Sequence, residues 1–438
     1  MRNGKVFIAT YGFPPYLKSL GGSIRILKLA EYLHEQGFDV TVVCARTRHF
    51  DTHGYDETLA KIKTIACDDP VATMGSRLTQ NTNGQSETTT PTARAGLGKA
   101  MARKLKAAVL EVMVPDTGLL VTSHMTRAIL DEISVLTEPI TVITSGPPHS
   151  IHMVGRRLKR LRKDVHWVMD YRDSWNGTSL FQKRHRLTQN INQRIERSCL
   201  KQADHLTYIS SPMLKKAERI AELALSEKST LIANGFDERL APAQAAQTGD
   251  NTESTQRHDY RIGYFGVLDF GATSYRDPAV IFRALSSLED EVKLVIHGPS
   301  SLEPGWQQRL GDRLVDGGKL SHTEALIAMT TMDALLLLHT RDEGADEVVT
   351  GKVFEYISTG LPIIAVGPKD MAVNALLARD PSFYWVHHHD AVGLSELFVQ
   401  LRNATRSSTP IRRSPEVIRA YSRTAQHEKF LRLLEAHQ

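Results

Sequence analysis

The 438-residue sequence lacks any long apolar run. Its longest apolar stretches, residues 334–338 and 361–366, have the length of a β-strand, whereas a membrane-spanning helix needs about 18 or more apolar residues. This excludes an integral membrane protein. The first apolar segment, residues 6–10, ends at Gly12 and two prolines and is too short for a signal peptide. We therefore expect a cytoplasmic protein.

Cysteine is scarce as well, with only Cys44, Cys67 and Cys199 in the chain. No two of them form a Cys-x-x-Cys pair, so the sequence predicts neither a zinc site nor a disulfide framework. No strand is followed by the Gly-x-Gly-x-x-Gly fingerprint of dinucleotide-binding proteins, which argues against a nicotinamide enzyme. We expect no metal and no cofactor.

Charge is distributed unevenly along the chain. Residues 1–220 contain 32 Lys and Arg against 20 Asp and Glu, and residues 221–438 contain 22 against 29. The first half is therefore expected to meet an anionic partner. Residues 156–163 hold six cations in eight positions, and residues 96–112 add four more among apolar side chains. These two segments predict reversible binding to an anionic membrane. The alternative is that they are solvated charged helices whose apolar side packs on the core. Neither interleaves aromatic residues, so nucleic acid is not expected.

Strand-length apolar runs alternate with helical patterns along the whole chain. The first series includes strands at residues 5–11, 39–45, 140–144, 165–171 and 206–210, and a second series begins near residue 261. Such alternation predicts βαβ units with parallel sheets. We expect an N-terminal Rossmann-like domain at residues 1–215, a second at 216–410, and a C-terminal helix at 411–438 that packs back toward the first domain.

Three segments of the first half follow predicted strands. Gly21-Gly22-Ser23 comes directly before a helix, where backbone N–H groups can bind a diphosphate, or where Ser23 only caps the helix. His149 lies after the strand at 140–144 and is either functional or a helix cap. The cluster 170–175 closes the next strand, and its charged residues can orient a sugar hydroxyl or pair with one another.

The second half carries a similar series of candidate ligand groups. Gly266 closes a strand, and Arg276 precedes the next helix, where a guanidinium can hold a phosphate through two hydrogen bonds. Gly351 leads into a helix that begins with Lys352 and carries Glu355 one turn later. Glu355 can accept hydrogen bonds from two ribose hydroxyls, while Lys352 meets phosphate.

Taken together, these motifs resemble the retaining family 4 glycosyltransferases of GT-B fold. The matching residues are Gly21-Gly22-Ser23, Asn234-Gly235-Phe236-Asp237, Tyr264-Phe265-Gly266, the pair Glu347 and Glu355, and the run from Lys352 to Tyr356 that continues into Gly360-Leu361-Pro362. Residues 145–150 and 170–175 look like the branch that makes bacterial exopolysaccharide, capsule or lipopolysaccharide.

The resemblance implies a doubly wound α/β architecture of two domains facing across a cleft. It also implies a nucleotide-sugar donor, a lipid-linked or saccharide acceptor, and front-face transfer with retention and without a metal, at the inner face of the cell membrane. Its implied catalytic residues are His149, Arg276, Lys352 and Glu347. Those on the donor side are Gly22, Ser23, Gly266, Gly351 and Glu355, and those on the acceptor side are Asp170, Arg172 and Asp173.

The chain departs from the family in one respect. The family places an Arg and a Lys close together to neutralise the diphosphate, but no lysine occurs between Phe265 and Val292. Lys352 is then the candidate for the second cation. The alternatives are a nucleotide-sugar-binding scaffold without turnover and a sugar-nucleotide epimerase on the same fold, which would need a further acid/base pair.

Overall fold

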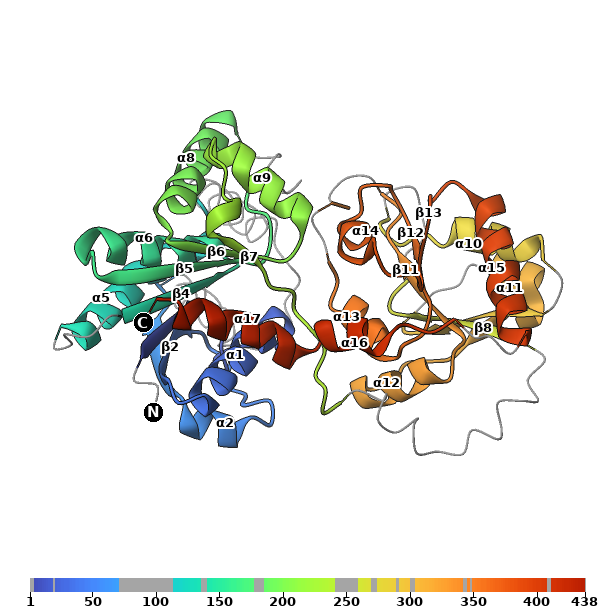
Figure 1. Cartoon of the computed structure of the whole chain (residues 1–438), viewed down its shortest axis with the longest axis horizontal. Helices are drawn as coiled ribbons and strands as arrows, with labels where there is room; N and C mark the ends of the chain where they lie inside the picture. Colours follow the sequence, from blue (N-terminus) through green and yellow to red (C-terminus); the bar gives the residue numbers. More distant parts are fainter. Residues whose placement is uncertain are drawn as a thin grey trace, which may run out of the picture. The chain divides into compact units, whose positions relative to one another are not determined.

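The computed structural model describes residues 4–18, 20–70, 113–134, 140–176, 185–240, 259–268, 274–288, 291–299, 304–341, 345–346, 349–407 and 411–437. The chain forms two units (Figure 1). Unit 1 contains residues 1–209, 213–232 and 429–438, and unit 2 contains residues 210–212 and 233–428.

Unit 1 is built on a parallel sheet of seven strands in the order β3-β2-β1-β4-β5-β6-β7. The strands are β1 (Lys5–Thr10), β2 (Asp39–Arg46), β3 (Lys63–Asp68), β4 (Ile140–Gly146), β5 (Val165–Tyr171), β6 (His205–Tyr208) and β7 (Ser229–Leu231). The central strands β1, β4 and β5 are almost wholly buried. Their near-continuous apolar sequences follow from this burial, since helices cover both faces of a parallel sheet.

The helices of unit 1 are α1 (Ile24–Glu35), α2 (Asp56–Lys61), α5 (Val121–Ile133), α6 (His152–Leu161), α8 (Arg186–Gln202) and α9 (Ser211–Ala221). Apolar residues of α5 and α6 pack in one core cluster with Phe7 and Val142. Those of α1 pack in another with Val6 and Ile143, together with Phe430 and Leu434 of the C-terminal helix α17 (Arg423–Glu435). Because neighbouring residues of one strand point to opposite faces, these clusters lie on the two sides of the sheet.

Unit 2 has a parallel sheet of six strands in the order β10-β9-β8-β11-β12-β13. The strands are β8 (Tyr260–Phe265), β9 (Val292–His297), β10 (Leu314–Asp316), β11 (Ala334–Leu338), β12 (Ile363–Val366) and β13 (Phe383–Val386). The helices are α10 (Ala279–Ser286), α11 (Pro304–Leu310), α12 (His322–Thr330), α13 (Lys352–Ser358), α14 (Ala372–Leu377), α15 (Ala391–Arg406) and α16 (Pro415–Ala420). Apolar residues of α10, α11 and α15 share one core cluster, and Figure 1 shows these helices together on one side of the sheet.

Each sheet reverses its strand order at one point, between β1 and β4 in unit 1 and between β8 and β11 in unit 2. Ligands of open α/β sheets bind outside the carboxyl ends of the strands at this switch point. In unit 1 the register aligns Thr10 with Ser145 and Ser145 with Asp170. The segments that follow β1, β4 and β5 therefore emerge side by side.

The prediction of two Rossmann-like α/β units is confirmed. The boundary differs from the predicted 215/216, because unit 1 continues to Ile232 and so includes β7. The last segment is also divided, since residues 411–428 belong to unit 2 and residues 429–438 to unit 1. Within the described residues, no helix has the combination of length and apolar character needed to cross a bilayer.

Candidate functional site

In unit 1, Arg172 joins two of the predicted motifs. Its Nε donates to the Gly146 carbonyl oxygen at 2.9 Å, and its Nη1 donates to the carbonyl oxygen of Gly22. The guanidinium is largely buried. Arg172 thus links the end of β4 to the glycine turn after β1, and its side chain is occupied by these carbonyl groups.

Asp170, by contrast, lies in a closed network. Its carboxylate pairs with Arg25 Nη2 at 2.9 Å and accepts hydrogen bonds from Ser145 Oγ and Thr207 Oγ1, both at 2.7 Å. The residue is 0% exposed. Burial raises the pKa of Asp170, but the charges of Arg25 and Arg172 outweigh this effect, so the net shift of the pKa is downward. This arrangement favours a structural role for Asp170 over contact with an acceptor. Asp170 does form an ion pair, but with Arg25, a partner that the sequence pattern did not indicate.

The other residues of these two clusters are placed differently. Asp173 is exposed, so it remains accessible to a ligand. Ser23 ends a 3-10 turn, Gly21–Ser23, that runs into α1, and its hydroxyl makes no capping hydrogen bond. Ser23 therefore occupies the N-cap position of α1 but does not cap the helix through its side chain.

His149 lies in a short 3-10 helix, His149–Ile151, directly after β4. It is 5% exposed, and its ring stacks on the indole of Trp175 with 5.2 Å between ring centroids and 7° between planes. Burial, together with nearby His152 and Arg172, holds the pKa of His149 well below its usual value. The imidazole is therefore neutral at pH 7 and suited to hydrogen bonding rather than to pairing with a phosphate.

In unit 2, Lys352 points at the backbone of Gly266. A Cβ atom on Gly266 would lie only 2.0 Å from Lys352 Nζ, and the Gly266 φ of +149° already disfavours other residues. The ammonium also lies 5.5 Å from the centroid of the Tyr264 ring. The absence of a side chain at Gly266 is thus what allows a cation to reach the carboxyl end of β8.

Arg276 supplies a second cation near this point. Burial and the nearby charge of Arg276 together lower the pKa of Lys352 to about 8. The Arg276 side chain is exposed, and its backbone N–H donates to Ser274 Oγ at 2.9 Å. Two neighbouring cations at a strand end suit a diphosphate, which would relieve their mutual repulsion.

Glu355 stands one turn along α13 from Lys352. Its Oε1 lies 3.8 Å from Nδ1 of His322, a residue that the sequence pattern did not single out. Burial raises the pKa of Glu355, while His322 and Lys352 oppose the shift. Gly351 precedes α13 and is exposed, and a Cβ atom added there would meet no other atom within 4 Å. The structure therefore brings Gly266, Lys352 and Glu355 together with Arg276.

Glu347, which the family resemblance implied as a catalytic residue, lies outside the described residues. In the part of the chain that is described, no cluster of three or more His, Cys, Asp or Glu side chains has a geometry that would hold a metal ion.

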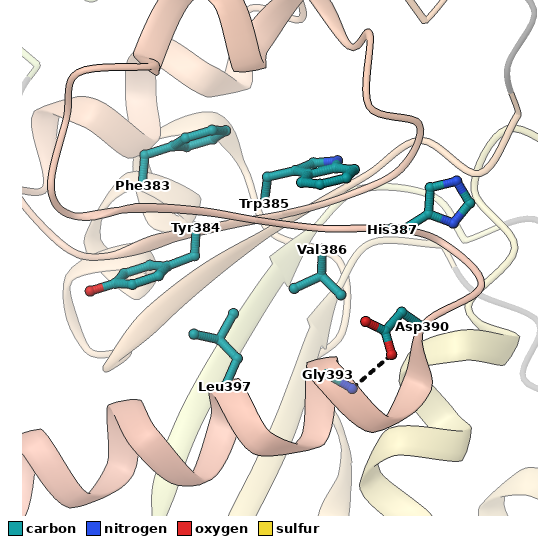
Figure 2. A pocket seen from close by; sticks show the side chains of 8 residues that line it. All are labelled: Phe383, Tyr384, Trp385, Val386, His387, Asp390, Gly393 and Leu397. Carbon is teal, nitrogen blue, oxygen red and sulfur yellow. Dashed lines mark hydrogen bonds between the residues drawn. The ribbon is translucent and has the colours of Figure 1, made fainter.

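A hollow of about 470 Å³ lies elsewhere in unit 2, along the edge strand β13 and the start of α15. Figure 2 shows Tyr384 and Val386 on the α15 side of β13. The Asp390 carboxylate accepts a hydrogen bond from the Gly393 backbone N–H at the start of α15. None of the candidate residues lines this hollow. It is therefore distinct from the cluster around Gly266.

Comparison with solved structures shows the fold. HepE of Anabaena, in complex with UDP, aligns with a TM-score of 0.61 at 12% identity, over 99% of this chain and 100% of that one. The chain has the GT-B fold. A glycosyltransferase of Rickettsia africae also aligns with a TM-score of 0.61 at 12% identity, over 100% and 99% of the two chains. The lipopolysaccharide outer core galactosyltransferase WaaB aligns with 0.57 at 14% identity, over 99% and 100%.

Sequence comparison adds a family match within this GT-B chain. Residues 21–235 match the family described as Glycosyl transferase 4-like domain. No curated protein matches the sequence significantly. The matched range covers almost all of unit 1 after β1, including Gly22, His149 and Arg172.

Proposed function

We propose that this GT-B protein is a retaining glycosyltransferase that moves a sugar from a nucleotide-sugar donor to a lipid-linked or saccharide acceptor in cell-surface polysaccharide synthesis. The main supporting observation is the cluster in unit 2. Lys352 reaches the Gly266 backbone, Arg276 lies close enough to lower the pKa of Lys352, and Glu355 follows one turn later on α13. Two cations and a carboxylate match the diphosphate and ribose of a nucleotide sugar.

In the proposed mechanism the nucleoside diphosphate leaves on the face from which the acceptor hydroxyl attacks. Arg276 and Lys352 stabilise the negative charge that develops on the departing diphosphate. Glu355 accepts hydrogen bonds from the ribose, and neutral His149 contacts the transferred sugar. The chemistry requires no metal, so activity should survive chelation. Loss of activity in chelator and its recovery with magnesium would contradict this.

A scaffold without turnover was the main alternative because a second phosphate-binding cation was missing from the loop after β8. Lys352 reaches the Gly266 backbone from another segment, which supports transfer over a scaffold role. Among the described residues, no specific observation favours an epimerase.

The donor test is a thermal-shift screen with nucleoside diphosphates and nucleotide sugars, since a ligand that binds only the folded state raises Tm. HepE was solved with UDP and UDP-glucose, so uridine nucleotides come first. Glu355→Ala should abolish most of the shift, whereas Glu396→Ala, a change in a glutamate on α15, should retain it. Equal shifts in both variants would remove Glu355 from the site.

Transfer itself is tested by release of nucleoside diphosphate in the presence of a lipid-linked acceptor extract. Arg276→Ala should lower kcat more than it raises the donor KM, because its contact strengthens as the diphosphate departs. The matched control is Arg283→Ala, an exposed arginine on the following helix α10. A change in donor KM alone would contradict the proposed role.

The proposal includes reversible attachment of unit 1 to an anionic membrane. Of the six cations at residues 156–163, Lys159 pairs with Asp204 and Arg162 with Asp164, each at 2.7 Å, so fewer charges are available than the sequence suggested. The other basic segment, 96–112, lies outside the described residues. Arg157 of this segment also lines a hollow of about 470 Å³ on α5 and α6, together with Arg127 and Asp131.

Vesicle co-sedimentation tests this attachment. Protein should sediment with anionic vesicles at low salt and remain in the supernatant at high salt or with neutral vesicles. Replacing the exposed pair Arg160 and Lys163 with glutamine should weaken binding more than the same change at Arg186 and Lys201 on α8. Equal recovery in the supernatant under all conditions would refute membrane attachment.

A further inference from the structure

Helix α8 holds the segment that follows β5 through two buried polar side chains. Glu196, 0% exposed, accepts hydrogen bonds from the Tyr171 hydroxyl and from the backbone and side-chain N–H groups of Asn176. Asn192, one turn earlier and also 0% exposed, accepts from Trp175 Nε1 at 2.8 Å. Residues four apart share one face of a helix, so α8 fixes both ends of this segment from a single face.

The segment in turn determines where the Trp175 ring lies. The Trp175 backbone N–H donates to the Tyr171 hydroxyl at 2.8 Å, and the Trp175 side chain is fully buried. The indole stacks in parallel on His149, and the Tyr171 ring centroid lies 6.1 Å from that of His149. A chain of contacts thus runs from Glu196 and Asn192 through Trp175 to the imidazole.

This network is poorly explained as a means of stability alone. A buried carboxylate without a cation is costly, and well-packed apolar side chains at such positions are often more stable. Within the described residues no lysine or arginine pairs with Glu196. The groups that face it are the Tyr171 hydroxyl, the Asn176 amide and the neutral Cys199 thiol, which itself lies near Arg156 and Arg160 of α6.

We propose that Glu196 and Asn192 are positioning residues for His149, and that they act by holding Trp175 against the imidazole. The catalytic part of this inference rests on the proposed glycosyl transfer; the geometric part does not. His149 has little rotational freedom while the indole covers its face. Loss of the hydrogen bonds to Glu196, or of the one to Asn192, would release the indole and allow the imidazole to leave the orientation needed for the sugar.

The network also predicts a pH dependence. Burial raises the pKa of Glu196 to about 7, against the hydrogen bonds from Tyr171 and Asn176. The Tyr171 hydroxyl and the backbone and side-chain N–H groups of Asn176 all donate to the ionised carboxylate. In the protonated acid, one carboxyl oxygen becomes a donor instead. Glu196→Gln imitates the protonated acid in shape and hydrogen bonding and removes the ionisation.

The first experiment does not depend on turnover. Protein carrying ¹³C at histidine Cε1 gives one NMR signal per histidine, and the His149 signal is identified by its loss in His149→Gln. Glu196→Gln and Asn192→Ala should each move the His149 signal, because the ring current of Trp175 changes with its position. Leu200→Val, a buried apolar change on α8, is the matched control and should leave the signal in place.

The second experiment uses the transfer assay of the proposed function. A misplacement of about 1 Å can cost about 100-fold in rate, so Glu196→Gln and Asn192→Ala should lower kcat about 10- to 100-fold while the donor KM stays nearly constant. The wild-type kcat profile should contain an ionisation near pH 7 that Glu196→Gln lacks. Trp175→Phe, which keeps a stacking ring, should retain more activity than Trp175→Leu.

The outcomes separate this inference from the function on which it rests. An unmoved His149 signal in both α8 variants overturns the positioning role whether or not transfer is observed. If the His149 signal moves in the α8 variants but their kcat is no lower than that of Leu200→Val, the position of His149 is not important for catalysis. Absence of transfer by the wild-type protein with every donor and acceptor refutes the glycosyltransferase proposal, and the NMR result still decides the geometry.

Discussion

Replacing Asp170 with asparagine tests whether this residue supports the fold or contacts a substrate. The change keeps the shape of the side chain but leaves the buried Arg25 guanidinium, 5% exposed, opposite a neutral amide. Asparagine also presents an NH₂ group where Asp170 now accepts from Ser145 or from Thr207. Breaking one partner of a buried pair costs about 3–5 kcal/mol, and we expect a loss of this size in the free energy of unfolding.

Urea unfolding followed by tryptophan fluorescence measures this loss. In a background with Trp306 and Trp385 changed to phenylalanine, the remaining tryptophans, Trp167 and Trp175, both report on unit 1. With an m-value of about 1–3 kcal/mol per molar urea, a loss of about 3–5 kcal/mol should lower the midpoint by about 1–5 M. The double variant Arg25→Met with Asp170→Asn should recover part of the loss, because it removes the uncompensated charge.

Acid provides a further check on the same pair. Because the folded-state pKa of Asp170 lies below the ordinary value of 3.8, its contribution is fully present above that value and is lost as the pH falls through the folded-state pKa. The difference in the free energy of unfolding between wild type and Asp170→Asn should therefore disappear in strong acid. A loss below 1 kcal/mol at pH 7, or a double variant no more stable than the single one, would refute the reasoning. A higher acceptor KM with an unchanged midpoint would return Asp170 to the acceptor site.

Three more predictions concern close approaches to glycine and the neighbouring charges. Gly266→Ala places a Cβ atom 2.0 Å from Lys352 Nζ, so calorimetry should show at least about tenfold weaker binding of the nucleoside diphosphate, about 1.4 kcal/mol; an unchanged Kd would contradict the proximity of Lys352 to the ligand. Burial and Arg276 lower the pKa of Lys352 to about 8, so donor kcat/KM should decline as the pH rises through about 8, and persistence of that ionisation in Lys352→Arg would disprove its assignment. Gly155→Ala forces a Cβ atom to 2.1 Å from Trp167 Nε1 and should destabilise unit 1 by about 1–3 kcal/mol through overpacking; an unaltered thermal midpoint would argue against this close packing.

The fold was largely predictable because its central strands are buried on both faces. The apolar runs predicted strands at 5–11 and 39–45, close to the observed β1 and β2. The pattern did not predict β3 or β7, which end the order of the first sheet and have no fully buried run. Strands at an edge lack the continuous apolar sequence on which such a prediction depends.

The candidate site was predictable only in part. Local sequence placed Gly266, Lys352 and Glu355 near strand ends and helix starts, but only the packing of unit 2 brings the Lys352 ammonium onto the Gly266 backbone. The pairing of Arg25 with Asp170 spans 145 positions and leaves no local pattern. Glu196 reads in the sequence as one more charged residue of a polar helix, because its burial is produced by the segment after β5.

The division of the chain has a consequence for how the protein folds during its synthesis. Unit 2 takes nearly all its residues from one uninterrupted stretch, 233–428, whereas the core of unit 1 includes Phe430 and Leu434 from the last turns of α17. A ribosome releases the chain from the N-terminus onward. Unit 2 can therefore complete its core first, while unit 1, although most of it is made earlier, keeps an apolar gap until residues 429–438 emerge. Removing residues 429–438 would leave that gap permanently open to water.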